Sequence, residues 1–139
     1  MLGSRRVGRE AALQIIYLKD ISRNGFDSIP ERVWSEEPMT PKIREFAAQL
    51  ADGVLAHQSA IDLLIKKYAE NWDMSRMAVI DRCLLRLAAY ELVHELGTPI
   101  NVIINEAVEI AKKFSTGESS KFVNGILDKI KLERKNGKS

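Results

Sequence analysis

Three arginines stand close together near the start of the chain, and their chemistry suits phosphate. Arg5, Arg6 and Arg9 fall in the first turns of a predicted helix, where positions 5 and 9 share one face. A guanidinium clamps phosphate through two parallel hydrogen bonds, and a tyrosine ring such as that of Tyr17 can stack on an unpaired base. A helix N-terminus repels cations, so three arginines placed there indicate a use other than helix stability. The arginine strip therefore predicts binding of single-stranded RNA. For Tyr17 alone, core packing is the more ordinary interpretation.

A second pairing of a cation with an aromatic ring occurs near the other end of the chain. Lys121 and Phe122 are adjacent at the expected start of the last helix. An aromatic ring beside a cation at an exposed helix start suits the stacking of a base, and an ordinary core position explains Phe122 equally well. Tyr68 fits either the edge of a helical bundle or a stacking surface. Spacing alone leaves both interpretations open.

The side chains that commonly carry catalysis or bind metal form no constellation in this sequence. His57 and His94 are the only histidines, and neither has a second His or Cys at metal-ligand spacing. Cys83 lies on or beside an apolar helical stripe, where a buried, inert thiol is expected. Glu106 and Glu109 are more typical of a solvated face or a helix-end contact than of acid–base work. We therefore expect no enzymatic activity, no metal and no cofactor.

Composition and charge fit a small globular protein. The chain has 139 residues, 45% hydrophobic and 29% charged, which suits a single domain over residues 1–139. One cysteine excludes an intramolecular disulfide. With no signal-peptide pattern and no bilayer-spanning apolar run, the sequence predicts a cytoplasmic protein.

The net charge is +2, but residues 1–23 carry +3, residues 121–139 carry +4 and the middle carries −5. Basic ends suggest a polyanionic partner, and solubilising tails are an equally good explanation.

Helical spacing of apolar residues recurs along the chain, and no strand-like alternation is sustained. Thr40-Pro41 and Thr98-Pro99 each combine a capping hydroxyl with a proline suited to the first turn of a helix. Apolar positions from Ile100 to Phe114 follow the spacing of an amphipathic helix. The expected helical segments are residues 4–22, a weaker one at 28–36, 40–68 with a bend near Ser59, 77–97, 99–114 and 119–132, followed by a frayed tail at 133–139.

These segments predict an all-α fold of about seven helices with mostly short connections. Ser119 is the expected cap of the last helix. Asn105 and Asn124 are candidates for buried polar links between helices. Gly125 is a candidate for a close helix–helix crossing, because glycine inside a helix otherwise only costs stability.

Several blocks of the sequence match a known bacterial family in order and spacing. The first is Arg9-Glu10-Ala11-Ala12-Leu13-Gln14-Ile15-Ile16-Tyr17, which is similar to Arg-Glu-x-Ala-x-Gln-x-Leu-Tyr. The later blocks are Asp81-Arg82 through Glu91-Leu92, Pro99 with Ile104-Asn105-Glu106-Ala107, and Phe122-Val123-Asn124-Gly125. Together they cover nearly the whole chain, which resembles the NusB family of transcription antitermination and rRNA-processing factors.

The resemblance implies a fold, a function and partners. The fold is two helical bundles packed into one domain. NusB proteins bind boxA, a short single-stranded RNA element of rRNA leaders, together with NusE, a protein of the small ribosomal subunit. The pair joins an antitermination complex on RNA polymerase and aids rRNA maturation. No membrane partner is implied, and the oligomeric state stays open.

Site residues are carried over position by position from the resemblance. The implied RNA surface comprises Arg5, Arg6, Arg9, Gln14, Tyr17, Tyr68, Lys121 and Phe122. The implied NusE side comprises Asp81, Arg82 and Glu118. Val7 and Gly8 interrupt a basic segment that is often denser in the family. We therefore expect tight boxA binding to require NusE.

Two other functions are compatible with the helical pattern. One is a free-standing relative of the RNA-binding domain of certain rRNA cytosine methyltransferases, which has the same helical fold. That interpretation predicts an attached catalytic domain, and this sequence ends after its last expected helix. The other is a protein-only helical adaptor, against which the arginine strip and Lys121-Phe122 argue weakly.

Overall fold

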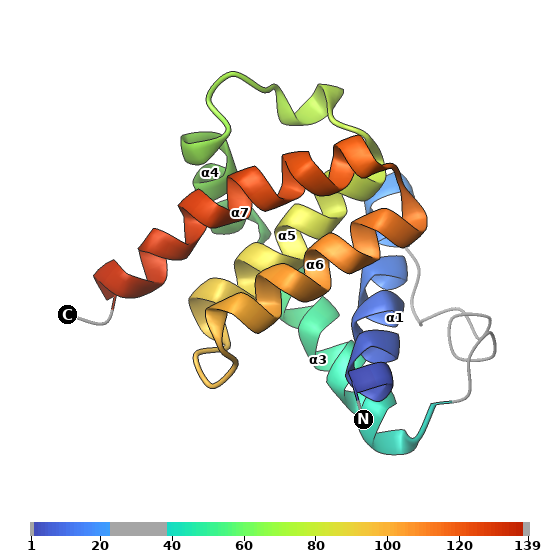
Figure 1. Cartoon of the computed structure of the whole chain (residues 1–139). Helices are drawn as coiled ribbons and strands as arrows, with labels where there is room; N and C mark the ends of the chain where they lie inside the picture. The colour runs from blue at the N-terminus through green and yellow to red at the C-terminus, as the bar shows by residue number, and fades with distance from the viewer. Residues whose placement is uncertain (1, 23–38, 138–139) are drawn as a thin grey trace. The chain divides into compact units, whose positions relative to one another are not determined.

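The structure, a computed structural model, describes residues 2–22 and 39–137, and it confirms the all-α prediction (Figure 1). Its helices are α1 (Leu2–Ile21), α3 (Pro41–Ala56), α4 (Gln58–Tyr68), α5 (Val79–His94), α6 (Ile100–Phe114) and α7 (Gly117–Gly137), with a 3-10 helix, η1 (Met74–Arg76). The helix expected at residues 28–36 lies outside the described residues. The chain divides into two compact units, residues 1–56 and 57–139, and each is described by itself.

The first unit is built from α1 and α3, which pack against each other. Apolar residues three and four apart are buried on both helices, including Leu13 and Ile16 of α1 and Leu50 and Val54 of α3. Thr40 caps α3, because its side-chain oxygen accepts a hydrogen bond of 3.2 Å from the backbone N–H of Ile43. The start signal at Thr40-Pro41 is thus confirmed.

The helical run that starts at Pro41 breaks at His57, close to the bend expected near Ser59. From there the second unit begins, with α5 at its centre in contact with α4, α6 and α7. Leucines of α5 such as Leu84, Leu85 and Leu92 are buried almost completely, as is Cys83, whose expected burial is confirmed. A helix buried on most of its circumference is the natural core of such a bundle.

Helix α7 is tied to α5 near both ends. Near the start of the two helices, the Ser119 hydroxyl donates a hydrogen bond of 3.0 Å to the Asp81 carboxylate. Near their ends, Arg134 reaches the last turn of α5. The two helices therefore run in the same direction, and α6 returns between their ends (Figure 1).

Arg134 bonds four backbone carbonyl groups of the second unit. Its guanidinium donates to the carbonyl oxygens of Leu92 (2.6 Å), Thr98 (2.6 Å), Glu91 and Glu95 (both 2.9 Å). The last carbonyls of a helix have no partner within that helix and carry partial negative charge. One buried side chain therefore completes the end of α5 and fixes the turn that follows. Burial lowers the pKa of this guanidinium, and Glu91 opposes the shift.

The end of α7 differs from the sequence expectation. The helix continues to Gly137, and Glu133 and Arg134, placed by the sequence at the start of a frayed tail, are both held by hydrogen bonds. The start also differs, because Thr116 and not Ser119 is the cap. The Thr116 side-chain oxygen accepts a hydrogen bond of 3.0 Å from the backbone N–H of Ser119.

Several polar residues on α6 and α7 also lie where the sequence did not place them. Asn105 and Asn124 are exposed, so neither is a buried link between helices. A side chain at Gly125 would meet nothing within 4 Å, so no close crossing occurs there. A solvated face was one of two positions expected for Glu106 and Glu109; Glu109 is exposed as that position requires, whereas Glu106 is buried.

We predict that Arg134→Ala lowers the free energy of unfolding by roughly 2–4 kcal/mol, because it leaves backbone carbonyls of α5 and the following turn without their donor. Arg134→Lys should recover only part of this loss, since an ammonium cannot match the fork geometry of a guanidinium. Urea denaturation followed by circular dichroism measures both changes. Lys131→Ala, on the same helix, removes only a surface ion pair with Asp128 and should change stability by less than about 0.5 kcal/mol. Equal effects of Arg134→Ala and Lys131→Ala would contradict the role given to Arg134.

Candidate functional site

The arginine strip lies along α1 and meets an aromatic ring of α3. The guanidinium carbon of Arg5 lies 4.2 Å from the centre of the Phe46 ring, and that of Arg9 lies 5.5 Å from it. Cations at these distances are attracted to the negative face of the ring. Arg5 is exposed and Arg6 half-buried, whereas Arg9 has only 4% of its surface exposed. Arg5 and Arg6 are therefore accessible to a phosphate, and Arg9 acts mainly within the fold.

Gly8 allows the Phe46 ring to lie against α1 beside the two arginines. A Cβ atom at this position would come within 2.7 Å of Cδ2 of Phe46 and within 3.3 Å of Cγ2 of Ile43. Any larger side chain would therefore displace the ring. The residue that interrupts the basic run in the sequence thus has a packing role in the structure.

A groove with a volume of about 370 Å³ opens beside Phe46 in this first unit. Lys42, Glu45 and Gln49 of α3 line it together with Arg5. The other two residues predicted for RNA in this unit, Gln14 and Tyr17, are half-buried farther along α1.

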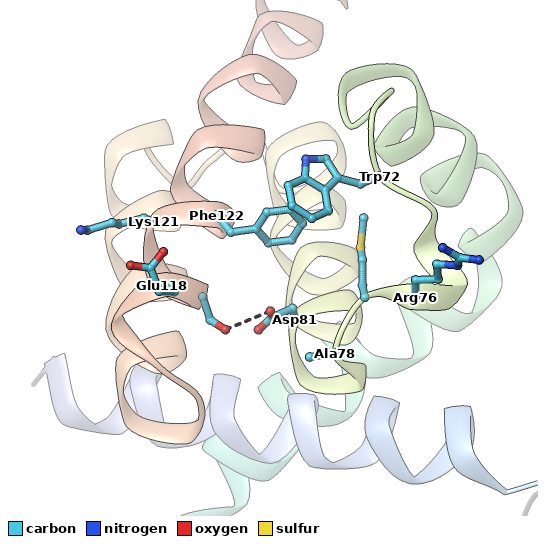
Figure 2. A pocket seen from close by; sticks show the side chains of 9 residues that line it. Trp72, Arg76, Ala78, Asp81, Glu118, Lys121 and Phe122 are labelled. Carbon is cyan, nitrogen blue, oxygen red and sulfur yellow. Dashed lines mark hydrogen bonds between the residues drawn. The ribbon is translucent and has the colours of Figure 1, made fainter.

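In the second unit a larger groove, of about 480 Å³, opens where α7 begins (Figure 2). Trp72 and Phe122 face each other across it edge to face, with ring centres 4.9 Å apart and planes at 72°. Phe122 is half-buried, whereas Trp72 keeps 58% of its surface exposed. We call this the aromatic groove; it is lined by Trp72, Arg76, Met77, Ala78, Asp81, Glu118, Ser119, Lys121 and Phe122.

Charged side chains of both signs line the aromatic groove. Arg76, Glu118 and Lys121 are exposed, and Asp81 has only 7% of its surface exposed. One carboxylate oxygen of Asp81 accepts the hydrogen bond from Ser119, and the other, Oδ1, is buried with no hydrogen-bond partner among the described residues. A buried carboxylate oxygen without a donor is costly, so Asp81 is set to accept one more hydrogen bond.

The segment that carries Trp72 is held in place from two sides. Asp73 caps η1 by accepting hydrogen bonds of 2.9 Å and 2.8 Å from the backbone N–H and hydroxyl of Ser75, and these bonds lower the pKa of its carboxyl. Arg82 of α5 donates to the carbonyl oxygen of Met74 at 3.1 Å. Arg82, predicted for the partner side, therefore helps to position the wall of the aromatic groove.

Tyr68 lies at the end of α4 and outside the aromatic groove. Its hydroxyl donates a hydrogen bond to the carboxylate of Glu133, which also pairs with Lys67 at 3.0 Å. The hydrogen bond with Tyr68 lowers the pKa of Glu133 and raises that of Tyr68. The tyrosine thus links α4 to α7, and its ring stays half-buried.

The structure brings together residues that the sequence had assigned to two different partners. Lys121 and Phe122, predicted for RNA, share the aromatic groove with Asp81 and Glu118, predicted for NusE. Sequence reasoning missed Trp72, although a tryptophan among polar residues between two helices was a usable signal. Phe46 gave no such signal, because only the pairing of α3 with α1 sets it beside the arginines.

The fold and these two grooves define a small helical protein that carries accessible arginine, lysine and aromatic side chains in grooves. Within residues 2–22 and 39–137, no helix is long and apolar enough to cross a membrane. The model of the NusB family matches residues 6–131, and the chain belongs to the NusB family.

Similar proteins span the whole chain. The transcription antitermination protein NusB of Elusimicrobium minutum is 44% identical over 140 residues, covering 99% of this chain and 100% of that protein. The transcription antitermination protein NusB of Bacillus subtilis is 43% identical, covering 93% of this chain and 95% of its own length.

Solved structures agree in fold. NusB of T. maritima has a TM-score of 0.80 at 41% identity, covering 93% of this chain and 91% of that one. A chain in a crystal structure of the antitermination factors NusB and NusE in complex with dsRNA has a TM-score of 0.81 at 26% identity, covering 95% of this chain and 98% of that one.

We predict opposite effects of alanine at two helical glycines. Gly8→Ala should lower the free energy of unfolding by roughly 1–3 kcal/mol, because the new methyl group overpacks against Phe46. Gly125→Ala, at an exposed helical position with open space around it, should raise stability by up to about 1 kcal/mol. Thermal and urea unfolding of the two variants measures the signs. Stabilisation by both substitutions would show that Phe46 is not packed on Gly8.

Proposed function

We propose that this chain is a transcription antitermination factor that binds boxA RNA together with NusE as part of a complex on RNA polymerase. The observation that carries the proposal is its match, over nearly its full length, to proteins named transcription antitermination protein NusB. We propose a binding role without enzymatic activity, performed in the cytoplasm.

The RNA contacts are proposed for the exposed cations and rings of each unit. Arg5 and Arg6 of α1 offer guanidinium groups to phosphates, and Lys121 offers its ammonium at the start of α7. Phe122 offers a ring in the aromatic groove. From buried or half-buried positions, Arg9, Gln14 and Tyr17 support these contacts within the first unit, and Tyr68 supports them within the second.

The NusE contact is proposed for the start of α7, with Glu118 as the direct contact. Glu118 is exposed, and a carboxylate suits a basic ribosomal protein. Arg82 is engaged with Met74, and one carboxylate oxygen of Asp81 is engaged with Ser119, so these two contacts hold this surface in shape. A chain similar to this one occurs in a structure that contains both NusE and RNA, which supports joint binding.

The alternatives are weaker. A relative of the RNA-binding domain of rRNA cytosine methyltransferases would share the fold, but the relatives with 44% and 43% identity are named as antitermination proteins. A protein-only adaptor would have no use for exposed cations beside aromatic rings on both units.

We predict that the double variant Arg5→Ala/Lys121→Ala weakens binding to boxA RNA and flattens its salt dependence. The slope of log K against log salt should fall by about 0.7 for each phosphate of a single strand that is no longer neutralised. Titrations by fluorescence anisotropy at several salt concentrations, with NusE present, measure this. The control Lys112→Ala/Lys129→Ala removes the same charge from exposed positions and should keep the slope of the wild type. A slope equal in both variants would mean that RNA binds elsewhere, and preference for duplex RNA would overturn the single-strand proposal.

We predict that Glu118→Lys weakens NusE binding at least several-fold while the protein stays helical, with a loss of stability limited to roughly 1–2 kcal/mol because the first turn of α7 exchanges a favourable anion for a cation. The reason is that an exposed carboxylate facing a basic protein becomes a repelling cation. Calorimetric titration of NusE measures the affinity. Asp128→Lys, an equal change of charge at an exposed position farther along α7, should bind NusE like the wild type. Equal affinities of all three proteins would place the docking surface elsewhere.

A further inference from the structure

The aromatic groove combines three features that no single partner assigned to its residues explains. Trp72 is largely exposed although indole is apolar, and it stands edge to face with Phe122. The exposed cations Arg76 and Lys121 line the same groove. Asp81, which also lines it, has a buried oxygen that lacks a donor among the residues described. The groove thus offers a flat apolar face and a hydrogen-bond acceptor, with the cations Lys121 and Arg76 on opposite sides of them (Figure 2).

An unpaired nucleotide matches all three features. A base has a π-face that stacks on an aromatic ring, and its phosphates seek cations. Amino groups on the base edge donate hydrogen bonds, which a carboxylate accepts. The indole of Trp72 is the larger and more accessible of the two rings, so it offers the main stacking surface.

A cationic side chain of a protein partner matches the groove less well. It could pair with Asp81 and lie on the rings, but the two exposed cations Arg76 and Lys121 that line the groove would repel it. Glu118 is the only exposed carboxylate among the residues that line the groove. The accessible charge of the lining therefore favours a phosphate-bearing ligand.

We propose that the aromatic groove is a base-binding subsite for single-stranded RNA, in which Trp72 stacks on one unpaired base and Asp81 accepts a hydrogen bond from its amino group. The subsite rests on the proposed RNA-binding function and adds Trp72 and Asp81 to the residues that contact RNA. Because the second carboxylate oxygen of Asp81 only accepts hydrogen bonds, the bases that carry an amino group, which are cytosine, adenine and guanine, are preferred over uracil.

The first test substitutes the stacking ring. Trp72→Leu should weaken binding of a cytidine 12-mer by roughly 5- to 150-fold, the range for loss of one base stack. Trp72→Tyr should restore much of the affinity. Leu96→Ala removes an apolar side chain with the same exposed fraction, 58%, outside the groove, and should bind like the wild type. Wild-type affinity of Trp72→Leu, in a protein that binds the 12-mer, would overturn the subsite and leave the proposed function intact.

A second measurement does not depend on how the variants at position 72 fold. The chain has two tryptophans, so in a Trp34→Phe background Trp72 is the only indole. Its fluorescence should be quenched as the cytidine 12-mer binds. Unquenched emission at saturating RNA would overturn the proposal. Quenching by an arginine-rich peptide but not by bound RNA would assign the groove to a protein side chain instead.

The third test concerns the base edge. Asp81→Asn can keep the contact with Ser119, but it replaces one acceptor oxygen by an amide donor. The affinity for the cytidine 12-mer divided by the affinity for the uridine 12-mer should therefore fall toward one or below. A purely structural role of Asp81 would weaken both oligonucleotides equally and would overturn the assignment of the acceptor. Absence of RNA binding by the wild type, with or without NusE, would instead refute the proposed function itself.

Discussion

The second unit depends on one electrostatic constraint, which is the negative end of α5. A helix that ends inside a protein must find donors for its last carbonyl groups. Here the guanidinium of Arg134 supplies them from the far end of α7. That contact joins the ends of the two helices, and at their starts Ser119 bonds Asp81. The aromatic groove lies at this second contact, so α7 is fixed on α5 both at the groove and at the opposite end of the helix.

Local patterns predicted the helices well, because apolar spacing and capping residues are local properties. The amphipathic stripe of α6 is one example, since Ile103, Ala107 and Ala111 are all buried as their spacing implied, although Phe114 at its end is 41% exposed. Tertiary contacts were harder to predict. In the sequence, Arg134 looks like part of a frayed tail because it stands among other charged residues. Nothing in that local pattern indicates its long-range hydrogen bond with the Leu92 carbonyl. In the sequence, Thr98 looks like the N-cap of the helix that follows. In the structure, α6 begins at Ile100, and the Thr98 carbonyl accepts a hydrogen bond from Arg134.

The candidate site was predictable in part for the same reason. Lys121 and Phe122 are neighbours in the sequence, so their joint appearance in one groove could be anticipated. The approach of Trp72 to Phe122 spans fifty positions and depends on how Arg82 and Asp73 hold the η1 segment. Arg9 looks like a phosphate ligand on helical spacing alone, and only the structure shows that its side chain is buried. The resemblance to a family named candidate residues without showing which of them are accessible to a ligand and which hold others in place.

Gly8 looks in the sequence like a gap in a basic segment, and in the structure it admits the ring that lies against Arg5. A fully mobile arginine loses much rotamer entropy when it grips a phosphate, and that loss subtracts from the affinity. An arginine already resting on an aromatic face has given up part of this freedom during folding. A short basic segment with one pre-ordered guanidinium can therefore match the phosphate affinity of a longer, fully mobile segment. A count of positive charges underestimates the affinity of such a short segment.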